Sequence, residues 1–453
     1  MKTDTLFEAF PPVPDKQWKQ QIQADLKGGD YNELLTWTSP EGIQVKPFYT
    51  ETDRKEPGGV PPRKGPWAIG YTLDMGEGED PAARAREALD GGADALVVTG
   101  AGHASLEGFS GLPEDTPLWV AWDHLEAKLP ESIPATLKGQ THLMADPIGG
   151  LLATGNWCAG MEADLEKPGE ARGSQTVLGI RASLYQEAGA NRMQELAYTL
   201  AHGLEYLLRA ETDPGLKALV ENPVFRVAIG GDYFMEIAKL RALRQGWALL
   251  ARAYGASGDC RILATPSRRN KTLYDYNTNM LRTTSECMSA ILGGADLVCN
   301  LPYDALYHLP NAFGDRMARN QLLLLRHESY FSEVGNPADG AYYIEALTDQ
   351  LGRKSLELLK TLEKGGGLLA QLKTHQIQKK IRESHAREQE AFNAGERILV
   401  GSNAYPNPDD RMSGELERPV FPGKRGRKTL IEPLPLRRLA AGYEQKRMDD
   451  EAR

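Results

Sequence analysis

The sequence contains few cysteines, and their spacing fits neither a metal site nor a disulfide framework. Only four cysteines occur in 453 residues, namely Cys158, Cys260, Cys287 and Cys299. No two of them form a CxxC pair, the spacing typical of zinc and redox sites. Because disulfide-rich folds belong to oxidising compartments, we expect four buried free thiols in a reducing one.

The sequence also lacks long apolar runs and an excess of positive charge. No apolar run approaches the length of about 18 residues needed to cross a bilayer. The opening segment, MKTDTLFEAFPPVPDKQW, has neither the basic region nor the apolar stretch of a secretory signal. The formal net charge of −9 argues against a nucleic-acid-binding surface. We therefore expect a cytoplasmic protein that binds neither membrane nor nucleic acid.

What the sequence does contain is a regular alternation of short apolar runs and amphipathic stretches. The stretches at 193–210 and 235–255 carry apolar residues at three- and four-residue spacing, which indicates helices. Strands alternating with helices predict βα units, and eight of them over roughly 240 residues are typical of a (β/α)₈ barrel of the TIM type. An open doubly wound sheet is the structural alternative. The eight apolar runs are Trp67–Leu73, Ala95–Gly100, Leu118–Trp122, Thr141–Ala145, Val177–Ala182, Phe225–Gly230, Arg261–Thr265 and Asp296–Leu301.

The segments on either side of these units differ from them in composition. Residues 1–65 begin with FEAFPPVP and one helix-like stretch, Asp15–Leu26. The apolar groups of this N-terminal arm have no core of their own, so we expect them to pack on a partner. Residues 66–365 are predicted to form the barrel, including a long helical region from Ala312 to about Lys364. Residues 366–453 are predicted to form a helical segment and an extended C-terminal tail rich in Pro and Gly.

Three local features have a structural interpretation. His375 and His385 lie ten residues apart without an acidic or sulfur partner at ligand spacing, so we expect solvated surface histidines. The basic cluster Lys424–Lys428 is interpreted as a solvated loop or docking patch. The two GGAD sequences, Gly91–Asp94 and Gly293–Asp296, lead into strands and are interpreted as helix C-caps rather than phosphate loops.

Several blocks at the strand-to-helix junctions resemble the methylmalonyl-CoA mutase family. They are PEGIQVKPFYTETD at Pro40–Asp53 and the segments Tyr185–Leu207, Phe234–Arg244 and Tyr276–Leu351. The blocks follow the family's order and together cover most of residues 40–351. The opening LFEAFPPVPDKQWKQQIQADL is similar to the small, non-catalytic subunit of the family's two-subunit bacterial members.

The resemblance implies a cofactor for the family that this chain is not expected to bind. In the catalytic chains, adenosylcobalamin supplies a carbon radical, and a histidine of a DxHxxG signature ligates the cobalt. This sequence contains no DxHxxG, and the residues after Gly365 lack the alternating apolar strands of an α/β domain. We therefore expect no cobalamin-binding domain, no metal and no cofactor bound by this chain alone, with the coenzyme held by a partner subunit.

The family's catalytic residues are also replaced. A histidine two residues before the glutamine of the second block contacts the substrate thioester in the catalytic chains, and Leu184 stands at that place here. The tyrosine of an RQY-type motif is missing as well, and the nearby Tyr71 stands in a different context. The resemblance thus implies no catalytic residue in this chain. It implies a heterodimer with a large catalytic subunit that interconverts succinyl-CoA and (R)-methylmalonyl-CoA.

The remaining residues of interest are polar members of the matching blocks and aromatic residues of the arm. We interpret the polar members as buried ion pairs and helix caps rather than substrate contacts, since buried charges must be paired. The aromatic residues are candidates for partner binding. The polar members are Gln186, Glu187, Glu236, Lys239, Arg282 and Arg319, and the aromatic residues are Phe7, Phe10 and Trp18.

Two other functions remain open from the sequence. One is a catalytic acyl-CoA mutase barrel that uses a separate cobalamin-binding subunit. The other is a cobalamin-independent barrel enzyme or acyl-CoA-binding protein. An enzyme of that kind needs its own acid–base pair, for which Asp123, His124 and Asp146 are the nearest candidates.

Overall fold

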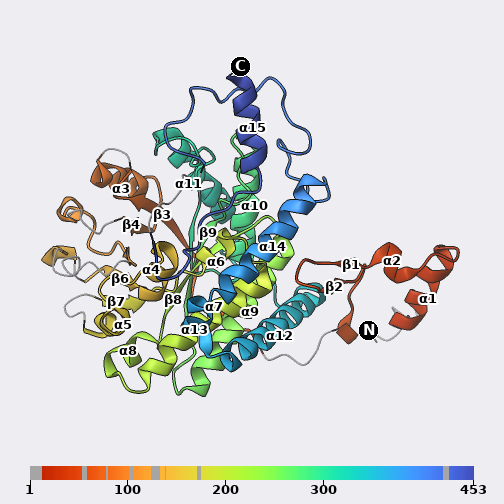
Figure 1. The fold of residues 1–453 in the computed structure, drawn as a ribbon, viewed down its shortest axis with the longest axis horizontal. Helices are drawn as coiled ribbons and strands as arrows, with labels where there is room; N and C mark the ends of the chain where they lie inside the picture. The colour runs from red at the N-terminus through yellow and green to blue at the C-terminus, as the bar shows by residue number, and fades with distance from the viewer. Residues whose placement is uncertain are drawn as a thin grey trace, which may run out of the picture.

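The structure is a computed structural model in which residues 13–53, 59–77, 80–100, 106–123, 133–137, 139–170, 175–421 and 428–452 are described. Phe7, Phe10, His124 and residues 424–427 of the basic cluster lie outside these ranges. A sheet surrounded by helices forms the body of the molecule, and an N-terminal arm projects from one side of it (Figure 1).

Eight parallel strands form one sheet that curves into a nearly closed barrel. Their order, β7-β6-β5-β4-β3-β10-β9-β8, follows the chain around the ring and leaves a seam between β7 and β8. The predicted (β/α)₈ barrel is confirmed, and the doubly wound alternative is wrong because that topology reverses the strand order at a switch point. The strands are β3 (Ala68–Asp74), β4 (Ala95–Thr99), β5 (Leu118–Trp122), β6 (Thr141–Ala145), β7 (Gln175–Leu178), β8 (Val224–Ile229), β9 (Arg261–Pro266) and β10 (Leu297–Cys299).

One residue of β8 bridges the seam. The backbone N–H of Arg226 donates to the carbonyl of Ile180 at 2.8 Å, and its side-chain Nε donates to the carbonyl of Gly179 at 3.1 Å. Both carbonyls follow β7, so this strand ends before the predicted run Val177–Ala182 does. The chain turns there into α6 (Ser183–Glu187), which brings the end of the run to the mouth of the barrel.

The barrel interior is filled by apolar side chains. One cluster has buried members from six strands, among them Trp119, Met144 and Leu263, and the partly buried Ala68 of β3 and Val177 of β7 pack against it. The Trp119 ring also stacks on His142, with ring centroids 4.1 Å apart. Because inward-facing residues of every strand meet in this cluster, the barrel axis is packed rather than open, as is usual for this fold.

Helices cover the outside of the barrel. The long helical region expected from Ala312 to Lys364 is two helices, because residues 328–341 contain none. The second of them, α12, packs across α7 and α9. The helices of the body are α3 (Pro81–Asp90), α4 (Pro147–Thr154), α5 (Met161–Glu170), α7 (Arg192–Ala210), α8 (Pro214–Leu219), α9 (Tyr233–Ala253), α10 (Thr278–Leu292), α11 (Ala312–His327), α12 (Tyr342–Lys364), α13 (Gly367–Lys373), α14 (Gln376–Asn393) and α15 (Ala441–Glu451).

The GGAD glycines end helices, as predicted. Gly91 is the C-cap of α3 and Gly293 that of α10. The following residues, Gly92 and Gly294, have φ of +98° and +90°, a conformation that favours glycine because it lacks a Cβ. Each pair therefore turns a helix into the next strand.

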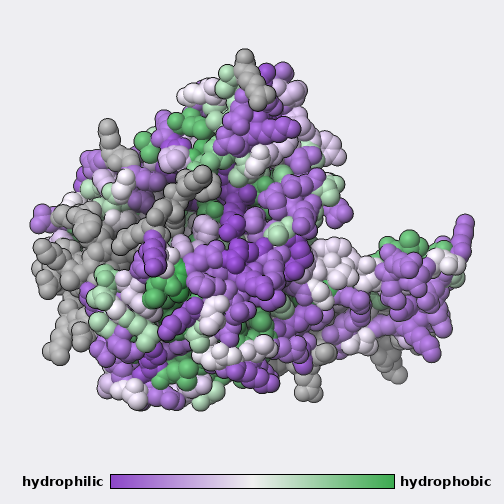
Figure 2. All heavy atoms as spheres, in the orientation of Figure 1, coloured by the Kyte–Doolittle hydropathy of each residue, from purple (hydrophilic) through white to green (hydrophobic). Residues whose placement is uncertain are grey.

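The N-terminal arm consists of α1 (Asp15–Asp25), α2 (Tyr31–Leu35), β1 (Trp37–Thr38) and β2 (Gln44–Val45). No residue of α1 is buried. Trp18 stacks on Phe48 with ring centroids 4.8 Å apart, yet 51% of Trp18 stays exposed. The space-filling view shows the arm as a narrow projection beside the body (Figure 2).

Two expectations about single residue types are wrong. Cys158 is exposed, whereas Cys260, Cys287 and Cys299 are buried as expected. His385 is not a free surface histidine, because it packs on the barrel and its Nδ1 lies 3.4 Å from Arg269. Burial and the Arg269 charge lower the pKa of His385 to about 4. In the described part of the chain, no helix combines the length and apolar character needed to cross a bilayer.

Candidate functional site

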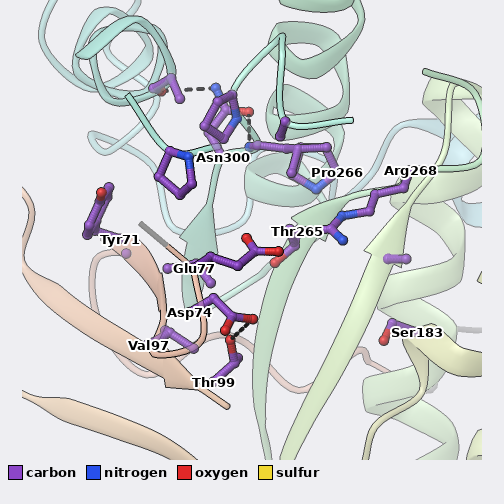
Figure 3. A pocket seen from close by; sticks show the side chains of 18 of the residues that line it. Tyr71, Asp74, Glu77, Val97, Thr99, Ser183, Thr265, Pro266, Arg268 and Asn300 are labelled. Carbon is purple, nitrogen blue, oxygen red and sulfur yellow. Dashed lines mark hydrogen bonds between the residues drawn. The ribbon is translucent and has the colours of Figure 1, made fainter. Parts of the chain in front are cut away.

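A cavity of about 820 Å³ lies at the carboxyl ends of the barrel strands, where active sites of this fold are found. Residues from β3, β4 and β9, among them Asp74, Thr99 and Thr265, point into it (Figure 3). Val97 and Leu263 line the cavity and also belong to the packed interior of the barrel. The cavity therefore ends at this apolar floor and does not continue along the barrel axis.

One wall of the cavity is polar, and its charges pair with one another. The hydroxyl of Tyr71 donates to Asp315 at 2.5 Å, and Arg84 donates to the same hydroxyl at 3.0 Å. Burial raises the pKa of Asp315, and burial together with the Asp315 charge raises the pKa of Tyr71. The phenol of Tyr71 thus stays protonated at neutral pH and is engaged by Asp315.

The same wall is tied to the C-terminal tail. Arg418 of the tail lies 2.9 Å from Glu77 and donates to the carbonyl of Ala305 at 3.1 Å. Asp304 lies 3.2 Å from Nδ1 of His308. We call the surface formed by Tyr71, Asp74, Glu77, Arg84, Asp304, His308, Asp315 and Arg418 the polar wall.

The opposite side of the cavity is mostly apolar. Residues 428–440, here called the strap, cross the mouth of the barrel and hold this side in place. Within the strap, Leu434 donates from its backbone to Leu152 at 2.8 Å, and Arg437 donates from its backbone to Glu187 at 2.9 Å. We call the surface formed by Leu184, Val227, Ala228, Pro266 and Leu434–Leu436 the apolar wall.

Two of the acid–base candidates, Asp123 and Asp146, lie within the described residues, and other side chains bind the carboxylates of both. Asp123 faces the cavity in an ion pair with Arg226, and Arg181 lies 3.3 Å away. Asp146 is fully buried beneath, where it accepts bonds from Nε2 of His202 at 2.9 Å and from the Tyr206 hydroxyl at 2.8 Å.

Asp146 also caps α4 through the backbone N–H of Gly149. Burial alone would raise the pKa of Asp146, but His202 and the charge of Arg226 hold it at about 2. A carboxylate that is buried and bonded in this way stabilises the fold and has no access to a substrate. His124 lies outside the described residues.

The family-signature residues divide into two groups. Leu184, Glu187 and Arg319 line the cavity, and Leu184 is only 5% exposed. Gln186 points away from it and accepts a bond from Ser267 at 2.9 Å. The others that do not line the cavity are Glu236, Lys239 and Arg282.

Glu236 and Lys239 belong to a set of buried charges outside the barrel mouth. Lys239 lies 2.6 Å from Glu236 and 2.9 Å from Glu195, while Arg192 lies 3.0 Å from Glu236 and 3.1 Å from Glu41. We call these five residues the buried charge cluster. Its three carboxylates outnumber its two cations. Burial, with the charge of Glu236 adding to it, raises the pKa of Glu195 to about 7.

Arg282 holds a loop rather than facing the cavity. Its Nη1 donates to Asn279 at 2.7 Å and to the Thr272 hydroxyl at 3.0 Å. Asn279 in turn donates to the carbonyls of Thr272 and Tyr303 at 2.9 and 3.0 Å. These bonds join α10 to the segments that follow β9 and β10.

Sequence reasoning missed most of the polar wall. Arg84 is in α3 and Asp315 in α11, so only the closed barrel brings them to Tyr71. Arg268, which lines the cavity just after β9, was also not recognised. Its position after the apolar run Arg261–Thr265 was the available signal, because residues at strand ends face the mouth of such a barrel.

The described residues contain no cluster of metal-ligating side chains. None of them forms a group of three or more His, Cys, Asp and Glu side chains placed to hold a metal ion. The single histidine in the described lining of the cavity is His308, and Asp304 engages it.

Comparisons with known proteins agree with the fold. The family model described as "Methylmalonyl-CoA mutase" matches residues 171–424. The chain is 31% identical to the methylmalonyl-CoA mutase small subunit of Porphyromonas gingivalis, over 99% of this chain and 78% of that protein. It is 31% identical to the small subunit of Streptomyces virginiae, over 92% of this chain and 74% of that protein. The chain belongs to the methylmalonyl-CoA mutase family.

Large subunits of the methylmalonyl-CoA mutase family are also similar to this chain, but over less of it. The large subunit of Porphyromonas gingivalis is 35% identical over 50% of this chain and 32% of that protein. The mutase-type barrel is therefore common to both kinds of subunit.

Proposed function

We propose that this chain is the small, non-catalytic subunit of a heterodimeric, adenosylcobalamin-dependent methylmalonyl-CoA mutase. The observation that carries the proposal is that Leu184 lines the cavity. The family resemblance assigns the histidine of the catalytic chains to the same position. A leucine side chain cannot donate a hydrogen bond to a thioester carbonyl. The large subunit would interconvert succinyl-CoA and (R)-methylmalonyl-CoA, and this barrel would support it.

The charges around the cavity support a structural role for the barrel. Asp123, Asp315 and Glu77 each pair with an arginine, and Asp146 is buried. A general acid or base has to reach its substrate within hydrogen-bonding distance. In this arrangement the carboxylates at the mouth hold the fold together, which favours a companion subunit over an independent enzyme.

The partner is assigned from the relatives and from the arm. Small and large mutase subunits are both known from Porphyromonas gingivalis and from Streptomyces virginiae. Trp18 of the arm is 51% exposed, although tryptophan is usually well buried. We assign residues 1–65, including Phe7, Phe10 and Trp18, to wrapping the large subunit. Deleting Met1–Lys27 should then weaken co-purification with it.

The remaining parts of the chain support that assembly. Residues 66–365 would form the mutase-type barrel, and residues 366–453 would form a helical segment and a C-terminal tail that crosses its mouth. The coenzyme is assigned to the large subunit, because this sequence contains no DxHxxG signature. Three buried free thiols suit the reducing cytoplasm, where we place the heterodimer.

Co-expression with the large subunit tests the proposal. Mutase activity should appear with the assembled heterodimer and be absent from this chain alone when coenzyme is added. Leu184→His, which introduces the missing donor, should leave the isolated chain inactive, because the coenzyme site is still lacking. Isomerisation by the isolated wild-type chain, with or without a separate cobalamin-binding protein, would contradict a non-catalytic role.

A further inference from the structure

The two walls of the cavity differ in whether their side chains have interaction partners. Along the polar wall, Tyr71, Asp304 and Asp315 bond to neighbouring side chains, and Arg418 pairs with Glu77. Nothing comparable occupies the apolar wall, whose leucines and valine border open space. Removing apolar surface from water is favourable in free energy, so an apolar group that covered this wall would be stabilised there.

Arg268 lies beside the apolar wall and is one of two cations in the described lining that form no hydrogen bond or ion pair, the other being Arg319. Arg268 follows β9, is exposed, and extends into the cavity toward Thr265 (Figure 3). Within the described ranges, its guanidinium makes no hydrogen bond or ion pair, and the hydroxyls of Ser183 and Thr265 have no partner either. Glu187 lines the same side, but its carboxylate accepts no bond from a described residue. The cavity therefore presents the free guanidinium of Arg268 and the free hydroxyls of Ser183 and Thr265 next to apolar surface.

We propose that this cavity binds a small organic acid with one carboxylate and a short apolar chain. The carboxylate pairs with Arg268, whose planar guanidinium can donate two parallel hydrogen bonds to it. The hydroxyl of Thr265, toward which Arg268 extends in Figure 3, can donate to the same group, and the chain lies against Leu184 and Val227.

The size and closure of the cavity limit the ligand. A volume of about 820 Å³ lies within the range of roughly 300–1,000 Å³ that is typical of small-molecule sites. Because Val97 and Leu263 belong to the packed floor, the ligand has to enter from the mouth and cannot extend along the axis. Binding of this kind does not depend on whether the chain supports a mutase, so it stands apart from the proposed function.

Calorimetric titration of the full chain with hexanoate tests the site. Hexanoate should bind saturably, and hexanamide, which has the same chain without the charge, should bind at least about tenfold more weakly, the cost of a lost charge-assisted hydrogen bond. Arg268→Gln should weaken hexanoate binding by a similar factor. The matched control is Arg387→Gln, which changes an exposed arginine of α14 and should leave binding unchanged.

Further variants separate the two halves of the site. Leu184→Asn should weaken hexanoate binding but not the preference for hexanoate over hexanamide, because Arg268 is retained. If Arg268→Gln lowers the melting temperature, Arg268→Lys tests the same charge in a conservative variant and should bind better than the glutamine variant. The absence of saturable hexanoate binding, or equal binding by wild type and Arg268→Gln, would overturn the proposal.

Discussion

The buried charge cluster and the N-terminal arm depart from the usual distribution of residues in opposite directions. In the cluster, Lys239, Glu195 and Glu236 are almost completely buried. In the arm, Trp18 and Trp37 are about half exposed, at 51% and 50%. Charged groups are seldom buried unless they are paired, and large apolar groups are usually covered. The buried charges of the cluster find their partners within the chain, whereas the large apolar side chains of the arm are not covered by it.

This difference indicates which parts of the molecule are complete. The cluster joins α7 and α9 of the body to Glu41, between β1 and β2 at the base of the arm, so its charges are paired within the chain. The arm has a hairpin whose two strands are each two residues long and a helix, α1, with no buried residue. Its aromatic side chains Trp18 and Trp37 remain half exposed. Under the proposed function, the body is a finished scaffold and the arm is finished by the large subunit.

The largest expected effect comes from removing the central cation of the cluster. Lys239→Met leaves Glu195 and Glu236 buried without their shared partner, which should lower the free energy of unfolding by about 3–5 kcal/mol. Urea denaturation followed by circular dichroism measures it. The double variant Lys239→Met with Glu195→Gln should recover part of the loss, because one uncompensated carboxylate is gone. A loss below about 1 kcal/mol for the single variant would show that the cluster does not stabilise the body.

A substitution in the arm should weaken binding to the large subunit without changing the stability of this chain. Trp18→Ala should weaken binding to the large subunit by about 30-fold, the typical cost of about 2 kcal/mol for an interface tryptophan, with an unchanged melting temperature. Surface plasmon resonance measures the affinity. Leu249→Ala is the matched control, since Leu249 is 58% exposed on α9 of the body. Equal losses for both variants would remove the distinction between arm and body.

The cluster should also make stability depend on pH. Because the folded-state pKa of Glu195 is about 7 and its ordinary value is 4.5, the folded protein retains a proton that the unfolded chain releases. The resulting stability is present below pH 4.5 and is lost as the pH rises through about 7.

Glu195→Gln should remove this slope and with it a change in the free energy of unfolding of about 2–3 kcal/mol between pH 5 and pH 8. Urea denaturation at several pH values measures it. Asp146 does not interfere, because its lowered pKa of about 2 acts only in more acidic solution, where stability is lost as the pH falls. An unchanged slope in the glutamine variant would mean that Glu195 is ionised throughout this range.

Much of the fold could be predicted from the sequence because parallel strands buried on both faces appear as continuous apolar runs. Leu118–Trp122 and Thr141–Ala145 match β5 and β6 without a shift. The strand predicted at Val177–Ala182 is too long at its end, because β7 ends at Leu178 and the residues after it form the turn into α6. No local pattern reveals that a strand ends where the barrel seam begins.

The site was less predictable because its partners are far apart in the chain. Leu184 and Glu187 could be placed at the cavity by the family blocks, but Lys239 and Glu195 are 44 residues apart and Arg192 and Glu41 are 151 apart. Such pairs leave no signal in spacing. Nor does the strap, whose position over the mouth depends on backbone bonds to residues of α4 and α6.

The smallest expected effect on stability is for an ion pair that is as close as those of Lys239 but exposed to solvent. Arg353 lies 2.7 Å from Asp349 on α12, as close as the pairs of Lys239, but its side chain is 61% exposed. Water already solvates both groups well, so Arg353→Ala should change the free energy of unfolding by less than about 0.5 kcal/mol. Urea denaturation beside Lys239→Met measures the contrast, and added salt should abolish whatever remains for Arg353. If the two variants lose similar stability, burial is not what distinguishes the cluster, and its stabilising effect would have to be ascribed to contact geometry alone.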